Sequence, residues 1–171
     1  MIESEQHAAE RGATALARIA GIGEVFDSVA EPLALSDATE AGRTMQAALG
    51  NAGYLQNQVD LFVAGADGRL ACDFADGYGA LRTFGRHAYF AGVTTIAGSA
   101  GQALAASGPL SLVAALEAMR RQEVFPIAGF ETPEKDLDLA YVKSARAERV
   151  DCVMVSAMGV GGTNVVFLLT R

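Results

Sequence analysis

Ser99 is the residue of this chain whose neighbours most resemble a nucleophile motif. It lies in the segment AGSAG (97–101), between an expected strand and an expected helix, where serine hydrolases of one class carry their nucleophile. Such an enzyme needs a histidine that follows the serine in the chain, whereas His7 and His87, the two histidines present, both precede it. The sequence therefore disfavours a serine hydrolase and favours a small residue that lets a turn close.

Three side chains near the start of another expected helix offer other chemistry. Cys72 is a possible nucleophile, but no base is identifiable beside it, and free cysteines commonly pack as small apolar residues. Asp73 and Asp76 are spaced i, i+3 on one helix face and could hold a metal, but no histidine cluster accompanies them. Carboxylates near a helix start favourably complement the helix dipole, so a structural role is the favoured interpretation. An enzyme that uses Cys72, Ser99 or the two aspartates remains the alternative.

A glycine-rich segment near the C-terminus could bind phosphate or form a turn. It consists of Gly159, Val160, Gly161, Gly162, Thr163 and Asn164. Phosphate-binding glycine loops lead into a helix whose N-terminus meets the phosphate, whereas VVFLLTR, a strand pattern, follows here. The segment is therefore expected to be a hairpin turn whose glycines adopt positive φ angles.

Composition narrows the classes of protein to which the chain can belong. Its 171 residues suit a single domain, 1–171, and its formal net charge of −7 argues against a nucleic-acid partner, whose phosphates require clustered Lys and Arg. The first residues, MIESEQHAAERG, lack the apolar core of a signal peptide, and no stretch is a convincing membrane span. Cys72 and Cys152 stand in no CxxC spacing, which indicates neither a disulfide framework nor a zinc site. A cytoplasmic protein without metal or cofactor is expected.

The elements that must position these residues alternate between strand and helix. Asp37 and Glu40 form a capping-box pattern before a helix, and Leu70, Phe74 and Tyr78 recur at helical spacing. The expected elements are a strand at 13–26, a helix at 37–49, a strand at 59–64, a helix at 70–85, a strand at 89–96, a helix at 102–119, an irregular connection at 123–141, and strands at 150–159 and 163–171. This βαβαβαββ order predicts an α/β fold with a largely parallel sheet and an antiparallel pair at its end.

The helix expected at 102–119 is unusual because it is apolar or small on nearly every side. No Asp, Glu, Lys or Arg occurs from His87 through Leu116. A helix of this kind is buried all round rather than along one stripe, and a small α/β domain covers two of its faces only with difficulty. We therefore expect a second chain to supply the other wall. Pro109 inside it would be costly unless the helix kinks or restarts there.

Several segments together resemble one family. ESEQHAAERGATALARIAGIG, VDLFVAGADG, FADGYGALRTFG, GSAGQALAASG and MGVGGTN, in this order and spacing, are similar to the C-terminal half of a β-ketoacyl synthase of the thiolase fold. The resemblance runs over nearly the whole chain. It implies a thiolase-like half, with a mixed sheet and helices, that a partner chain completes.

The same resemblance implies that the catalytic groups have been replaced. Gly65 takes the place of the family's first catalytic histidine, Ala97 that of a lysine and Gln102 that of the second histidine. In the closing turn, which we expect to line the pocket, Val160 replaces a phenylalanine. The two histidines of an active synthase donate hydrogen bonds to a thioester carbonyl as negative charge develops there, which glycine cannot do and glutamine does only partly.

The implied function is that of a non-catalytic subunit similar to a chain-length factor. Such a subunit pairs with an active ketosynthase of a type II polyketide or fatty-acid-type synthase and shapes the tunnel for the growing acyl chain. The resemblance further implies that the N-terminal half is a separate ketosynthase-like chain. It also implies that the acyl carrier protein is an indirect partner, and that this chain holds no catalytic residue, metal or cofactor of its own.

Overall fold

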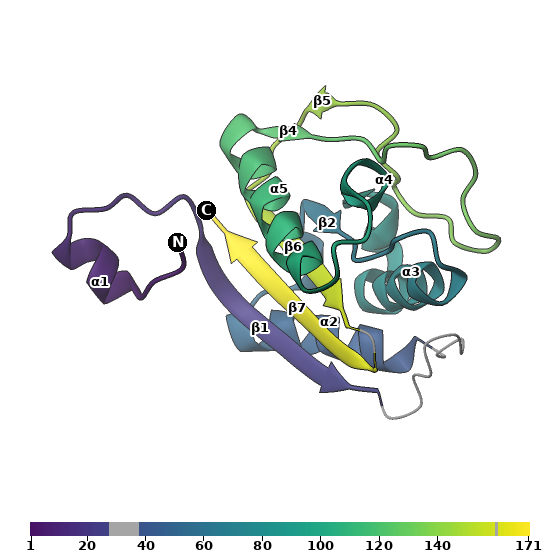
Figure 1. Ribbon diagram of the computed structural model, residues 1–171, viewed down its shortest axis with the longest axis horizontal. Helices are drawn as coiled ribbons and strands as arrows, with labels where there is room; N and C mark the ends of the chain where they lie inside the picture. Colours follow the sequence, from purple (N-terminus) through teal and green to yellow (C-terminus); the bar gives the residue numbers. More distant parts are fainter. Residues whose placement is uncertain (28–37, 160) are drawn as a thin grey trace.

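A computed structural model describes residues 1–27, 38–159 and 161–171 (Figure 1). The helices are α1 (Glu5–Glu10), α2 (Thr39–Ala52), α3 (Leu70–Phe84), α4 (Ala97–Ala100) and α5 (Ser107–Arg121), with 3-10 turns η1 (Gln56–Gln58), η2 (Gly85–Tyr89) and η3 (Leu104–Ala106). The strands are β1 (Arg18–Phe26), β2 (Leu61–Val63), β3 (Gly92–Thr94), β4 (Glu123–Val124), β5 (Arg146–Ala147), β6 (Cys152–Met158) and β7 (Thr163–Thr170).

The main sheet has the strand order β1-β7-β6-β2-β3. β2 is parallel to both β3 and β6, whereas β7 is antiparallel to both of its neighbours, β6 and β1. The predicted βαβαβαββ order and the antiparallel pair at the end are therefore confirmed, but the sheet is more evenly mixed than predicted. The irregular connection is also confirmed, apart from the short ribbon of β4 and β5.

Successive strand residues supply two separate cores on opposite faces of the sheet. Phe62 and Met154 belong to the core beneath α2 and α3, whereas Leu61, Val63 and Val153 belong to the core beneath α5. This alternation follows from the two-residue period of a strand. The fold is consequently a three-layer arrangement, with α2 and α3 on one face and α5 on the other (Figure 1).

Glycines in β1 let α2 approach the sheet unusually closely. A Cβ on Gly21 would lie 2.2 Å from the Ala48 carbonyl oxygen, and one on Gly23 would lie 2.0 Å from the Thr44 carbonyl oxygen. No side chain fits at such distances, so the glycine spacing of RIAGIGEVF places the backbone of α2 directly against β1. The glycine-bearing bend in the predicted strand thus serves a packing contact.

The start of α2 differs from the predicted capping box. Its N-cap is Ala38, in the left-handed conformation and without a side-chain capping hydrogen bond, while Asp37 lies outside the described residues. Glu40 forms an ion pair with Arg43 at 2.8 Å instead. The helix thus begins one residue later than a cap at Asp37 requires, and the side-chain cap by Asp37 itself stays a prediction.

The buried face of α3 is formed by small residues rather than by the large apolar ones that indicated the helix. Gly77, Gly79 and Ala80 are buried, whereas Leu70 is exposed and Tyr78 is only partly buried. A Cβ on Gly79 would lie 3.0 Å from the Cβ of Ala41 in α2, so the two helices pack at close range. Helical spacing identified the helix correctly, but close helix–helix packing selected the small residues for burial.

The helix expected at 102–119 is α5, which begins at Ser107 and ends at Arg121. Pro109 consequently lies in the first turn, where a proline breaks no intrahelical hydrogen bond, which agrees with the expectation that the helix kinks or restarts near this residue. This chain by itself covers only one side of the helix, and that a second chain covers the other side stays a prediction. Ala115 and Met119 face the core, while Leu110 and Val113 are 41% and 57% exposed.

The N-terminal residues extend away from the three layers (Figure 1). None of the residues of α1 is buried. An ion pair joins His7 to Glu3, which Arg11 also contacts. No helix of the described part of the chain is long and apolar enough to span a bilayer.

Candidate functional site

The positions that the sequence analysis singled out lie at one edge of the sheet. Gly65 follows β2, Ala97 follows β3, and the glycine-rich turn follows β6. Because these three strands are parallel neighbours, their carboxyl ends meet at the same edge. Ligand sites of α/β folds form at this edge, outside the carboxyl ends of the strands.

Gly65 occupies a confined position without a side chain. Its backbone N–H donates to Oδ2 of Asp76 at 2.7 Å. A Cβ at this position would lie 3.1 Å from the carbonyl oxygen of Ser156 and 3.4 Å from the backbone nitrogen of Met158. The space that a larger side chain would need at residue 65 is therefore partly taken by β6.

Asp76 is a structural residue of this edge. It is fully buried, and its carboxylate accepts hydrogen bonds from the Gly65 N–H and from Oγ of Ser156 at 2.8 Å. Burial raises the pKa of its carboxyl to about 6, although these hydrogen bonds partly oppose the shift. Asp76 thus joins α3 to the ends of β2 and β6.

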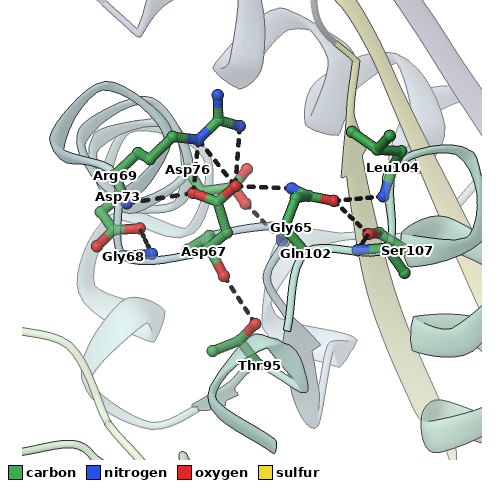
Figure 2. A network of polar contacts seen from close by, with 12 residues as sticks. Gly65, Asp67, Gly68, Arg69, Asp73, Asp76, Thr95, Gln102, Leu104 and Ser107 are labelled. Carbon is green, nitrogen blue, oxygen red and sulfur yellow. Dashed lines mark hydrogen bonds and ion pairs between the residues drawn. The ribbon is translucent and has the colours of Figure 1, made fainter. Parts of the chain in front are cut away.

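Asp67, Arg69 and Gln102 form a polar network next to Gly65 (Figure 2). The Asp67 carboxylate accepts from Nε2 of Gln102 at 2.6 Å and forms an ion pair with Arg69 at 2.8 Å. Its side chain is 3% exposed. Burial acts to raise the pKa of Asp67, but the hydrogen bonds from Arg69 and Gln102 outweigh it and hold that pKa below the usual value.

The carbonyl of the Gln102 side chain is engaged on the other side of the network. Oε1 accepts from the backbone N–H of Leu104 at 2.8 Å and from the hydroxyl of Ser107. Gln102 therefore uses both ends of its amide to connect β2 with the segment that enters α5 (Figure 2). One N–H of the amide is left over, so the side chain offers a ligand at most one donor.

Ala97 begins α4 and is held by a neighbouring threonine. The hydroxyl of Thr95 donates to the Ala66 carbonyl at 2.8 Å and accepts from the Ala97 N–H at 3.2 Å. The next residue, Gly98, packs so tightly that a Cβ would lie 2.0 Å from the Ala128 carbonyl oxygen. Contacts of the backbone thus fix the turn. Ala97, Gly98 and Ala100 carry no ionisable group.

A cleft of about 470 Å³ opens at this edge, between α3 and the segment 127–141. Ala97 and Asp67 belong to its wall, whereas Gly65, Gln102 and the described residues of the closing turn do not. Its acidic wall residues are Asp67, Asp73, Asp76, Glu131 and Glu134, and its wall contains no Lys, Arg or His. The cleft consequently offers no positive group to an oxyanion or a carboxylate ligand.

The closing turn has the predicted hairpin form. β6 and β7 pair in antiparallel register on either side of it, and the Gly159 N–H donates to the Thr163 carbonyl at 2.7 Å. Gly161 and Gly162 both have φ of +96°, as a turn of this kind requires. The Asn164 side chain donates to the Gly162 carbonyl at 3.3 Å, and Val160 lies outside the described residues. That this turn lines a pocket stays a prediction.

The alternative reactive residues have no arrangement suited to catalysis. Burial raises the pKa of the Cys72 thiol to about 11, the opposite of what a thiolate nucleophile needs. Ser99 is exposed, and His87 is placed with Nε2 at 2.8 Å from the Val59 carbonyl oxygen. Asp73 accepts from the Gly68 N–H at 3.0 Å, and burial raises its pKa. Within the described ranges no three His, Cys, Asp or Glu side chains are grouped to hold a metal ion.

Sequence reasoning missed Asp67, Arg69 and Ser107. The first two stand in the segment ADGR directly after a buried strand, where an acid and a base two residues apart could have been noted as a candidate ion pair. Ser107 had no such signal, because its partner is a side chain that only the fold brings near. The described geometry therefore adds an ion pair, between the Asp67 carboxylate and the half-exposed Arg69, to the three positions considered.

The chain matches the family described as "Beta-ketoacyl synthase, C-terminal domain" over residues 16–131. It is 31% identical to 3-oxoacyl-[acyl-carrier-protein] synthase 2 of Coxiella burnetii, over 100% of this chain and 42% of that protein. It is also 31% identical to the putative polyketide β-ketoacyl synthase 1 of Streptomyces cyaneus, over 99% of this chain and 40% of that protein. The chain thus spans about two fifths of the length of these relatives.

Solved structures share the fold. A type II polyketide synthase acyl-carrier protein in complex with its ketosynthase bound to the hexaketide gives a TM-score of 0.92 at 24% identity, covering 99% of this chain and 42% of that chain. The ishigamide ketosynthase/chain length factor gives a TM-score of 0.90 at 24% identity, covering 99% and 41%. A β-ketoacyl synthase from Burkholderia phymatum gives 0.87 at 26% identity, covering 99% and 41%.

Proposed function

The chain belongs to the β-ketoacyl synthase C-terminal domain family, and from this premise we propose that it is a non-catalytic ketosynthase-like subunit. It pairs with an active ketosynthase of a type II polyketide or fatty-acid-type synthase, and its edge of the sheet helps to shape the tunnel that holds the acyl chain. Its role is that of a chain-length factor. The acyl carrier protein interacts with the catalytic partner rather than with this chain directly.

The single observation that carries this proposal is the state of positions 65, 97 and 102. Gly65 and Ala97 have no side-chain donor. The Gln102 amide donates to Asp67 and accepts from the Leu104 N–H. The carboxylate of Asp67 further places negative charge beside the position where a synthase must stabilise negative charge. Oxyanion stabilisation requires donors aimed at the developing charge, and the loss of one such donor costs about 10²- to 10³-fold in rate.

The open side of α5 supports the pairing. Leu110 and Val113 are largely exposed although they belong to a stretch of the sequence without charges. The relatives are more than twice as long as this chain, so their remaining length is available to cover such a side. Exposed apolar surface of this kind typically marks an interface.

Reconstitution tests the proposal. The chain is co-expressed with the products of its neighbouring genes, and any complex that forms is assayed for condensation and for decarboxylation of a malonyl thioester on a carrier protein. We expect co-purification with a ketosynthase, condensation activity that a Cys→Ala change in this catalytic partner abolishes, and no activity of this chain alone.

The same assay separates the proposal from an enzyme with new chemistry. Cys72→Ala, Ser99→Ala and Asp73→Asn in this chain are expected to leave turnover within about twofold, because none of them contacts the reacting atoms. A loss of a hundredfold or more in any one of them, with the complex intact, contradicts the non-catalytic role.

A further inference from the structure

One wall of the cleft is a loop, residues 127–142, whose two ends are joined. The Ile127 N–H donates to the Val142 carbonyl at 3.0 Å, so the loop is closed at its base. The Val142 N–H in turn donates to the Val93 carbonyl at 2.9 Å, which ties this base to β3. Compact surface loops whose ends lie close together are frequently functional.

The tip of this loop, residues 131–136, is held less firmly than its base. Every residue of this range is exposed, although Glu131 and Glu134 contribute to the cleft wall. Among the residues that the structure describes, no hydrogen bond or ion pair joins the tip to α3, which forms the opposite wall. Left-handed residues stand at its two ends, Gly129 with φ of +75° and Asp136 with φ of +64°. A few loop residues of this kind can absorb the change in φ and ψ that a hinge requires.

Leu137, the residue that follows the tip, packs directly against α3. It is 2% exposed, yet it belongs to neither of the two cores. A Cβ on Gly77 of α3 would lie 2.7 Å from its Cδ1 and 2.9 Å from its Cδ2, so the leucine fills the notch that the glycine leaves. Its carbonyl accepts from the Tyr141 hydroxyl at 3.0 Å. One apolar side chain thus fastens the end of the tip to the opposite wall.

Charge acts against this closed arrangement. The cleft wall has carboxylates on both sides and no Lys, Arg or His; they are Glu131 and Glu134 on the tip, and Asp67, Asp73 and Asp76 opposite. Burial raises the pKa of Asp73, and the charges of Asp67 and Glu134 add to this shift. Tyr141, the remaining titratable residue of the wall, stays neutral because burial raises its pKa to about 12. The charge of the tip is therefore felt at α3.

We propose that residues 131–136 are a lid that opens and closes the cleft, that Leu137 in the notch at Gly77 is its latch, and that the facing carboxylates oppose closure. The latch favours the closed state because its release exposes a leucine to water, whereas like charges across the cleft favour the open state. A balance of this kind can be shifted by anything that interacts differently with the two states. The device goes beyond the proposed function and does not depend on it, because it uses only residues of the described cleft.

Hydrogen exchange of the native chain, followed by NMR, tests whether the lid opens by itself. The Leu137 N–H, which donates to the Glu134 carbonyl at 3.1 Å, reports on the lid, and the Val155 N–H in the central strand β6 reports on global unfolding. We expect exchange at Leu137 to be independent of urea at low concentration, because lid opening exposes little surface, whereas exchange at Val155 accelerates with urea. The same dependence on urea at both amides would overturn the lid.

Two leucine variants separate the latch from the core. Leu137→Ala empties the notch and is expected to make exchange at residue 137 about 10- to 100-fold faster. Leu139→Ala is the matched control, because Leu139 is buried in the core beneath α2 and α3 and stays packed in either position of the lid. The control is expected to accelerate exchange at Val155 and to change lid opening at Leu137 by at most about twofold. Equal acceleration of lid opening in both variants would overturn the latch.

Gly77→Ala tests the same contact from the helix. The added methyl group occupies the notch, while alanine favours the helix, and we expect exchange at Leu137 to become about 10-fold faster or more. In combination with Leu137→Ala, the glycine change is expected to add at most about twofold, because both changes remove one shared contact. Effects that simply add in the double variant would overturn the notch as the seat of the latch.

Glu131→Gln combined with Glu134→Gln removes the charges of the lid. We expect exchange at Leu137 to slow by about two- to fivefold at neutral pH and low salt, and the difference to shrink in about 0.5 M NaCl. Glu24→Gln combined with Glu123→Gln is the matched control, because it removes the same charge from exposed positions outside the cleft wall, and it is expected to leave exchange at Leu137 unchanged. An equal effect of both pairs would overturn the role of the facing carboxylates.

Discussion

The two faces of the main sheet differ in how completely this chain covers their apolar side chains. On the face beneath α2 and α3, glycines bring the helix backbone into direct contact with β1, and the core is closed by residues of this chain. On the face beneath α5, Leu110 and Val113 remain exposed, and so do Ile22 and Phe26 of β1. Ile22 pairs with Phe167, which packs against the core beneath α5, so these strand residues lie on the same side as the helix.

The face beneath α2 and α3 is packed by this chain alone, whereas the face beneath α5 leaves apolar side chains exposed. Close backbone contact tolerates no change in residue volume, whereas an open apolar face tolerates changes until its partner binds. Under the proposed pairing, one face serves folding and the other serves assembly. The following substitutions test that distinction, and the largest expected effect comes first.

Gly23→Ala is expected to break the closed face. The added Cβ would lie 2.0 Å from the Thr44 carbonyl oxygen, so α2 must move away from β1. We expect a loss of about 3 kcal/mol or more in the free energy of unfolding, measured by urea denaturation. Gly50→Ala in the same helix is the control, since a Cβ there meets nothing within 4 Å, and it is expected to be neutral or stabilising. Equal effects of the two changes would contradict close packing at Gly23.

Met119→Ala and Val113→Ala compare the two sides of α5 itself. Met119 is buried in the core beneath the helix, whereas Val113 faces outward. Truncation of Met119 leaves a cavity and is expected to lower the free energy of unfolding by about 3 kcal/mol, whereas truncation of Val113 is expected to change it by at most about 0.5 kcal/mol. Val113→Ala is expected to weaken assembly instead. A large loss of stability in Val113→Ala would show that its side is already covered in the chain alone.

Asp76 gives the closed face a pH dependence. Burial raises its pKa to about 6 in the fold, from an ordinary value of 3.8. For an acid whose folded pKa is raised, the stabilising contribution is fully present below the unfolded pKa and is lost as the pH rises through the folded pKa. We expect the free energy of unfolding to fall by about 2 kcal/mol between about pH 4 and pH 7 from this group.

Asp76→Asn is the matched variant for that titration. Its amide can donate to the Ser156 hydroxyl while its carbonyl accepts from the Gly65 N–H, so the geometry is preserved without the charge. Urea denaturation across the pH range is expected to show a flatter profile for Asp76→Asn than for the wild type. Parallel profiles would mean that Asp76 titrates with the same pKa in the folded and unfolded chain.

Much of the fold was accessible from the sequence, because strand and helix periods differ and turns carry glycine. The α3 face was not, since the apolar residues Leu70 and Tyr78 indicated a helix but not which side packs at close range. The start of α5 was also missed, because Gln102 and Ser107 hydrogen-bond each other across the turn and delay the helix. Such contacts between side chains have no period in the sequence.

The candidate site, like the fold, was only partly predictable from the sequence. The positions Gly65, Ala97 and Gln102 were implied by the family resemblance, and parallel strands place the first two at one edge. The Asp67–Arg69 ion pair and its link to Gln102 depend on rotamers and on the approach of two loops, which the spacing does not encode. Sequence reasoning therefore did not give this network, and that the three positions mark a vacated site stays a prediction.

Gly65→Ala tests how much room remains for a side chain at position 65. Its expected effect on stability is smaller than those of Gly23→Ala and Met119→Ala. The new Cβ would lie 3.1 Å from the Ser156 carbonyl oxygen and 3.4 Å from Oδ2 of Asp76, which is tighter than ordinary contact but far less severe than at Gly23. We expect a loss of about 1 kcal/mol in the free energy of unfolding, because β6 must shift by a few tenths of an ångström. A neutral or stabilising result would mean that position 65 has kept room for a side chain. In that case Gly65→His would be a practical way to place a hydrogen-bond donor at position 65. Lack of space would then no longer explain why this position has no donor side chain.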